Sequence, residues 1–138
     1  MLANAIAYAA EAHRLQKDKR GEPYILHPMR VVLALKAAQW SETYQVAAAL
    51  HDTVEDTDTT LEDIHERFGP CIGEAVDALT RRRTETYKDY IIRCCENKIA
   101  GVVKRYDVYD NFDPSRYCEG IPVKRYAWAL EYLNNGKR

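Results

Sequence analysis

The sequence contains no long hydrophobic run. Apolar residues make up 46% of its 138 residues, yet no stretch approaches the roughly 20 apolar residues that a membrane-spanning helix needs. The opening segment, MLANAIAYAAEAHR, carries an acid and helical apolar spacing where a secretory signal would carry a basic segment. We therefore predict a cytoplasmic protein with no membrane segment.

The cysteines also lack the patterns of a disulfide framework or a zinc site. Cys71, Cys94, Cys95 and Cys118 show no C-x-x-C spacing, and two of them are adjacent. We predict that all four are reduced and pack as small hydrophobic side chains.

An excess of charge of either sign is missing as well. Twenty lysines and arginines face 21 aspartates and glutamates, so the net charge is −1. No overall positive charge is available to recruit nucleic acid or an anionic membrane, and a polyanionic ligand would need a local cluster of cations. The length leaves room for one core, so we predict a single domain over residues 1–138.

Alternating strand patterns are nearly absent, whereas apolar residues recur three and four positions apart. We therefore predict an all-α fold. Helices are expected at about residues 2–15, 28–38, 41–55, 61–68, 72–79 and 123–133, with one long helix carrying an apolar stripe from Tyr87 to Tyr106 and continuing to Asn111.

Three local signals refine these boundaries. Thr60 and Asp63 have the spacing of a capping box, and Gly69 followed by Pro70 is typical of a helix stop. A residue before proline is pushed out of the α region, so His27 is expected in extended backbone with Pro28 opening the next helix.

Several ionisable residues follow the apolar run at 46–50 in the sequence. His51 and Asp52 follow it directly, at a buried helix end where an unpaired charge is costly and a divalent cation would compensate it. Glu55 and Asp56 project toward the same region if the helix persists. The group is either a metal site with its own acid–base pair or a solvated acidic turn with a hydrogen-bonded histidine.

A second polar group lies on the long helix, where Asp107 and Asn111 share a face and Lys104 precedes the aspartate by three residues. The alternative for this group is a surface stripe of weak polar contacts. His13, on the inner side of the first helix, is predicted to be a hydrogen-bonded core histidine rather than a ligand.

Three motifs occur in order: GEPYILHP ending at residue 28, HDTVEDTDTT at 51–60 and VKRYDVYDN at 103–111. Together they resemble the HD-domain alarmone hydrolases of the Rel/Spo type, especially their small stand-alone and metazoan single-domain forms, over about residues 5–112. The resemblance implies an HD-domain helical bundle that removes the 3′-pyrophosphate from (p)ppGpp. It also implies one manganese ion held by His27, His51, Asp52 and Asp107.

The same resemblance assigns further roles. In that family the pair matching Glu55 and Asp56 is catalytic, and the asparagine matching Asn111 lies in the same site. The family's synthetase half has no counterpart here. Two imidazoles and two carboxylates independently suit an octahedral cation with open positions, and mixed N/O donors favour manganese over zinc. The cations that could neutralise substrate phosphates are Lys19, Lys104, Arg14 and Arg20.

The sequence departs from the family pattern near the expected nucleotide. Asp18-Lys19 stands where an Arg-Lys pair commonly helps to hold the purine, Asp110 replaces a histidine or tyrosine, and Asp113-Pro114 replace Arg-Thr. The base of the small-molecule nucleotide therefore stays open between guanine and adenine, as in (p)ppApp.

The products would be GDP or GTP, or ADP or ATP, together with pyrophosphate. Two alternatives remain at this point: an HD-type phosphatase of ordinary nucleotides or NADPH, and a non-catalytic nucleotide-binding HD module. The sequence leaves the oligomeric state open.

Overall fold

The computed structural model describes residues 1–116 and 118–135, and every regular element in these two ranges is helical. The predicted all-α class is confirmed. The elements are α1 (Leu2–Ala12), α2 (Leu26–Ala37), α3 (Glu42–Leu50), α4 (Thr53–Asp56), α5 (Leu61–Ala78), α6 (Tyr87–Cys94), α7 (Lys98–Asn111), the 3-10 turn η1 (Pro114–Arg116) and α8 (Val123–Asn135).

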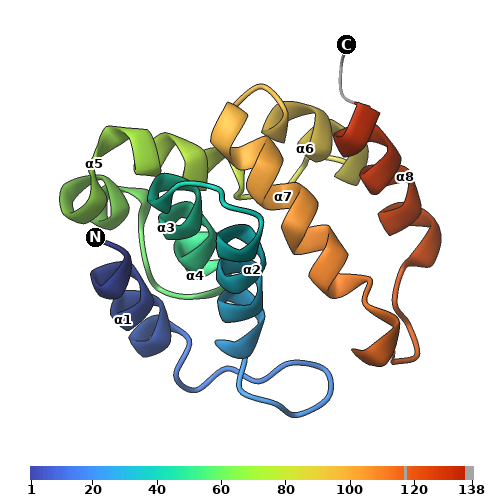
Figure 1. Cartoon of the computed structure of the whole chain (residues 1–138), viewed down its shortest axis with the longest axis horizontal. Coiled ribbons are helices and arrows are strands. Elements are labelled where there is room, and N and C mark those ends of the chain that lie inside the picture. Colours follow the sequence, from blue (N-terminus) through green and yellow to red (C-terminus); the bar gives the residue numbers. More distant parts are fainter. Residues whose placement is uncertain (117, 136–138) are drawn as a thin grey trace.

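Helices α2, α3 and α7 pack against one another at the centre of the bundle (Figure 1). Helix α1 covers α3 on one side, α5 contacts α3 and α7, and α6 and α8 pack against α7 on the other side. None of the helices in the described part of the chain has both the length and the apolar character needed to cross a bilayer.

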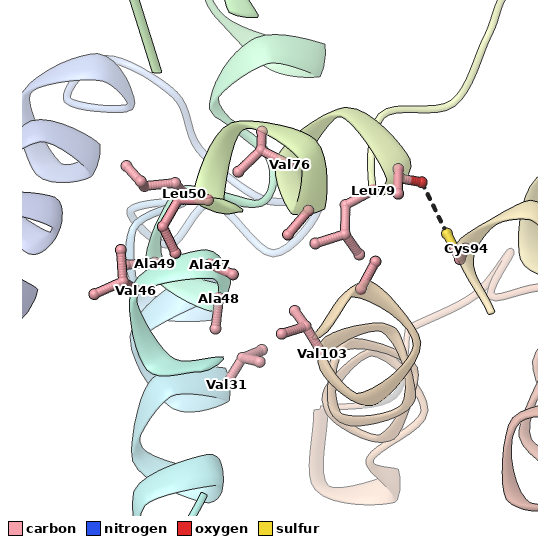
Figure 2. Close-up of a cluster of buried hydrophobic side chains, with 14 of the residues drawn as sticks. Val31, Val46, Ala47, Ala48, Ala49, Leu50, Val76, Leu79, Cys94 and Val103 are labelled. Atoms are coloured by element: carbon pink, nitrogen blue, oxygen red, sulfur yellow. Dashed lines mark hydrogen bonds between the residues drawn. The ribbon is translucent and has the colours of Figure 1, made fainter. Parts of the chain in front are cut away.

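The core is built around α3, which is buried along most of its length. Figure 2 shows Val31 of α2, Val76 of α5 and Val103 of α7 arranged around the run from Val46 to Leu50. The central alanines of this run are completely buried, and their small side chains let several helices approach α3 closely. Because α3 runs through the interior, His51, which follows it directly, is also buried.

The structure corrects the prediction for His27. Helix α2 begins at Leu26, so His27 is helical rather than extended, and Ile25 already has φ −55° and ψ −24°. Pro28 is tolerated in the first helical turn, because the N–H groups of that turn have no partner within the helix. As a result, His27 and Arg30 are three residues apart on one helical face.

Two predicted helices are interrupted. The helix after Ser41 ends at Leu50, and Asp52, with φ −105° and ψ 0°, separates it from the single turn of α4. The long helix predicted from Tyr87 divides into α6 and α7, since the Asn97 side chain accepts a hydrogen bond from the Ala100 N–H at 2.9 Å and starts a new helix. Local capping therefore outweighs the continuous apolar stripe.

The other boundary signals are confirmed. Thr60 and Asp63 form the reciprocal capping box, and Gly69 breaks α5 with φ 89° and ψ 169°. The first helix ends at Ala12, earlier than predicted, and the last extends to Asn135.

In the described part of the chain the structure places none of the four cysteines in a disulfide. Cys94 is buried and its thiol donates to the Ala78 carbonyl at 3.0 Å, the dashed line in Figure 2. Cys71 is exposed, so the prediction of hydrophobic packing is wrong for that residue.

Candidate metal centre and adjoining cleft

Four side chains from distant parts of the chain converge at one buried point. His27 comes from α2, His51 and Asp52 directly follow α3, and Asp107 comes from α7. One donor atom from each lies within 4.8 Å of all the others. The closest pair is His27 Nε2 and Asp107 Oδ1 at 2.7 Å, and His51 Nε2 lies 3.3 Å from the same oxygen. The four residues predicted as metal ligands are therefore brought together.

The electrostatics of this cluster favour an additional positive charge. Burial alone would lower the pKa of His27, but hydrogen bonds to Asp107 and Asp110 outweigh it and raise the pKa to about 9. His51 behaves similarly: burial opposes its charge, yet Asp52 and Asp107 raise its pKa well above the usual range. Nitrogen and carboxylate donors in such an arrangement could hold a divalent metal ion.

Surrounding groups fix the orientation of both imidazoles. The Nδ1–H of His51 donates to the Ala48 carbonyl at 2.6 Å, and the Nδ1–H of His27 donates to Asp110 Oδ2 at 2.7 Å. The Nε2 atom of each ring consequently faces the centre. Such outer contacts set the tautomer and the ring orientation of metal-binding histidines.

The two carboxylates are held from outside in the same way. The Tyr24 hydroxyl donates to Asp52 Oδ2 at 2.5 Å, and Lys104 Nζ donates to Asp107 Oδ2 at 2.7 Å. Asn111 Nδ2 donates to Asp107 Oδ1 at 3.2 Å. Burial disfavours the charge on Asp107, but Lys104 and the imidazoles hold its pKa well below the usual range. Burial likewise opposes the charge on Asp52, but His51 holds the pKa of that carboxyl below its usual range, so both carboxylates stay ionised.

Glu55 and Asp56 occupy the turn next to the cluster. Both keep contact with solvent, and their partial burial raises the pKa of each carboxyl, with a further contribution from Asp52. Glu55 accepts a hydrogen bond from the Arg81 backbone N–H at 2.9 Å. Raised carboxyl pKa values with access to water are suited to proton transfer.

Asp56 is connected to the first helix through a side-chain relay. Gln16 Nε2 donates to Asp56 Oδ2 at 3.3 Å, and the Nδ1–H of His13 donates to Gln16 Oε1 at 2.8 Å. His13 is buried and outside the group of four ligands, in agreement with its predicted role.

A cleft of about 280 Å³ opens beside His27 and Asn111. Lys19 and Arg20 line it, whereas Lys104 and Arg14 do not. Lys104 is buried against Asp107. Arg14 pairs on the surface with Glu11 at 2.8 Å. The full lining is Lys17, Asp18, Lys19, Arg20, Tyr24, His27, Arg30, Asp110, Asn111, Arg116, Cys118, Ile121, Pro122 and Tyr126.

Asp18, expected near the nucleobase, stabilises its own loop through side-chain-to-backbone hydrogen bonds. Its Oδ1 accepts backbone hydrogen bonds from Arg20 at 2.8 Å and from Glu22 at 2.9 Å. Sequence reasoning missed Tyr24, Arg30 and Arg116. For Arg30 the spacing of three residues from His27 was a usable signal, but only with His27 placed inside the helix.

Comparison with known proteins identifies the family. The HD domain profile matches residues 5–90. The chain belongs to the HD domain family. A guanosine-3′,5′-bis(diphosphate) 3′-pyrophosphohydrolase of Aquifex aeolicus is 39% identical over 115 residues, which cover 78% of this chain and 16% of that protein. A GTP pyrophosphokinase of Streptomyces coelicolor is 32% identical over 124 residues, which cover 83% of this chain and 15% of that protein. This HD domain thus spans only a small part of these relatives.

Solved structures agree with this assignment. A structure described as a metazoan ortholog of SpoT that hydrolyzes ppGpp and plays a role in starvation responses matches with a TM-score of 0.78 and 29% identity, covering 97% of this HD domain and 84% of that chain. The protein lmo0812 of Listeria monocytogenes matches with a TM-score of 0.64 and 28% identity, and the match covers 84% of this HD domain and 83% of that chain. The predicted relationship to the Rel/Spo enzymes is confirmed.

Proposed function

We propose that this HD domain is a metal-dependent hydrolase that removes the 3′-pyrophosphate from (p)ppGpp or a related alarmone such as (p)ppApp. The products are GDP or GTP, or ADP or ATP, and pyrophosphate. The observation that carries the proposal is the convergence of two imidazoles and two carboxylates beside a cleft lined with cations. The descriptions of the Aquifex relative and of the metazoan structure support pyrophosphate release.

The proposed cofactor is one Mn²⁺ ion held by His27, His51, Asp52 and Asp107. The donor set fits this ion, because two nitrogens and two carboxylates combine borderline and hard ligands and leave coordination positions open. When bound, the ion would lower the pKa of a coordinated water and withdraw charge from the phosphorus centre.

The chain's own residues divide the remaining work. Glu55 and Asp56 orient the attacking water and accept its proton, and Gln16 holds the Asp56 carboxylate in place. Asn111 steadies Asp107 from within the same helix. Lys19 and Arg20 face the cleft and neutralise phosphate charge.

Two predicted substrate ligands take different roles in this proposal. Lys104 acts through Asp107, since its ammonium group is buried on that carboxylate. Arg14 lies outside the cleft and is paired with Glu11, so we assign it no direct contact with the nucleotide. We further propose that residues 1–138 form one HD-type domain acting in the cytoplasm on a small-molecule nucleotide rather than on nucleic acid.

The test is product analysis with manganese-loaded protein. Incubation with ppGpp or ppApp followed by chromatography is expected to yield GDP or ADP and pyrophosphate. Release of orthophosphate from an ordinary nucleotide or from NADPH, with the alarmones unchanged, would identify a phosphatase instead. Stoichiometric metal without turnover of any phosphorylated nucleotide would identify a non-catalytic module.

The Glu55→Gln variant separates chemistry from metal binding. Because it removes a proton acceptor but no predicted metal ligand, we expect kcat to fall at least about 100-fold with unchanged manganese content. Glu74→Gln, an exposed change in α5, is the matched control and should keep wild-type turnover. Equal rates for Glu55→Gln and wild type would remove Glu55 from the mechanism.

A further inference from the structure

Arg30 lies one helical turn after His27 in α2 and lines the cleft beside the candidate metal centre. Its Nε donates to both oxygens of Asp110, at 2.9 and 3.2 Å. The side chain of Arg30 is 32% exposed, whereas that of Asp110 is 11% exposed. One edge of the guanidinium is therefore anchored inside the protein while the side chain remains open to solvent.

The terminal nitrogens of Arg30 are available for a ligand. Among residues 1–116 and 118–135, only Asp110 hydrogen-bonds to the Arg30 side chain, and it does so through Nε alone. The N–H groups on Nη1 and Nη2 therefore make no hydrogen bond within this part of the protein. A guanidinium held in this way is prearranged to bind phosphate oxygens through a pair of parallel hydrogen bonds.

Asp110 is shared between Arg30 and two other groups. The same carboxylate accepts from Arg116 Nη2 at 2.5 Å and from the Nδ1–H of His27 at 2.7 Å. Asp110 thus shares its negative charge between two guanidinium groups, of which Arg116 has a second carboxylate partner in Asp113 at 3.2 Å. The cationic side chains along the cleft are Lys17, Lys19, Arg20, Arg30 and Arg116, against the carboxylates of Asp18 and Asp110.

This distribution contrasts with the chain as a whole, whose net charge is −1. A cleft with a surplus of cations in a nearly neutral protein concentrates anionic ligands at one place. Arg30 is the cation of this group that shares a helical face with a candidate metal ligand, His27. A phosphate bound by Arg30 would consequently lie close to the reaction centre.

We infer that Arg30 binds a phosphoryl group of the nucleotide substrate and sets the preference for highly phosphorylated nucleotides. Asp110 is the positioning residue that holds Arg30 in the cleft. The inference rests on the proposed function, because it names a residue that recognises the substrate of the same site.

The first test compares the steady-state kinetics of Arg30→Gln and Arg30→Lys with those of wild type, with ppGpp and manganese. Loss of charge-assisted hydrogen bonds to phosphate is expected to raise KM about tenfold or more in Arg30→Gln, with a much smaller change in kcat. Arg30→Lys should be intermediate, since an ammonium group cannot hold Asp110 and a phosphate in the same geometry. Arg83→Gln, in the exposed connector before α6, removes the same charge outside the cleft and should leave KM unchanged.

Metal content and thermal midpoint are measured for each variant. Asp110 stays bound to Arg116 when Arg30 is changed, so we expect full manganese occupancy. If Arg30→Gln nevertheless loses manganese, the KM of the manganese-loaded Arg30→Lys variant is compared with that of wild type instead. A KM equal to that of wild type in a metal-loaded variant would overturn the inference.

A binding experiment distinguishes this inference from the proposed function. Calorimetric titration of protein freed of divalent ions with inorganic pyrophosphate should give a Kd that rises about tenfold or more in Arg30→Gln and is unchanged in Arg83→Gln. If wild type hydrolyses no alarmone but shows this difference, the proposed function fails and the phosphate site stands. If alarmones are hydrolysed while Arg30→Gln changes neither KM nor pyrophosphate affinity, the phosphate site fails alone.

Discussion

Asp110 shows how a single side chain links the candidate metal centre to the cleft. The sequence marks it only as a departure from the family motif at the nucleotide-facing surface. In the structure its carboxylate binds the Nδ1–H of His27 and also two arginines, Arg30 and Arg116. A carboxylate on the outer nitrogen makes an imidazole a better and more rigid metal ligand.

The change Asp110→Ala should therefore weaken manganese binding, by about 10- to 100-fold in Kd, as measured by calorimetric titration. Asp113→Ala is the matched control, because Asp113 also pairs with Arg116 but has no hydrogen bond or ion pair with His27. Equal affinities in the two variants would show that the contact with His27 does not support the metal.

The pH dependence of turnover is a second prediction at this scale. Burial raises the pKa of Glu55 above its usual value of 4.5, and a general base acts in its ionised form. As pH falls, the rate should therefore begin to decline above pH 4.5. The measurement is kcat across the acidic range at saturating manganese. An acidic limb centred below the usual glutamate pKa would contradict this expectation.

At the scale of the elements, backbone conformation at one glycine divides α5. Gly69 has φ 89° and ψ 169°, a region that is essentially restricted to glycine. A β-carbon there would meet nothing within 4 Å, so replacement costs backbone strain and not a steric clash. This break lets the first part of α5 follow its capping box while the second part packs its apolar face in the core.

Gly69→Ala should accordingly lower the free energy of unfolding by about 1–3 kcal/mol, measured by urea denaturation. Gly101→Ala is the matched control in the interior of α7, where the new β-carbon would lie at an ordinary 3.5 Å from the Cys95 Cα. Alanine is the better helix former, so this control should be neutral or stabilise by up to about 1 kcal/mol. Equal effects of the two changes would contradict the strain argument.

At the scale of the whole molecule, the candidate metal site connects the central helices. Its donors come from α2, from the residues after α3 and from α7, which are the helices that pack together at the centre (Figure 1). An ion that binds the folded state and not the unfolded chain stabilises the fold by mass action.

Manganese should therefore raise the thermal midpoint, with a gain of about 2.7 kcal/mol when free ion exceeds its Kd about 100-fold. Asp107→Asn should abolish the shift, whereas Asp77→Asn, which alters an ion pair with Arg82 far from the cluster in sequence, should retain it. Scanning calorimetry with and without the ion makes the comparison. A full shift in Asp107→Asn would place the ion elsewhere.

The sequence alone determined the helical class, the capping box at Thr60, the break at Gly69 and the four candidate metal ligands. The helical signals are local, because apolar spacing, caps and glycine act within a few residues. The candidate metal ligands could be predicted for another reason: they lie in motifs whose order resembles that of a known family.

Tertiary structure decided what depends on contacts between distant segments. Arg30 and Asp110 are 80 residues apart, and their pairing across α2 and α7 turns a surface arginine into part of the cleft. The Lys104–Asp107 pair is buried because α7 packs against α2 and α3, and His27 meets both Asp107 and Asp110 across the same packing of α2 on α7. No local pattern encodes these outcomes, because the free energy that sets them comes from packing and ion pairing between helices that meet only in the folded chain.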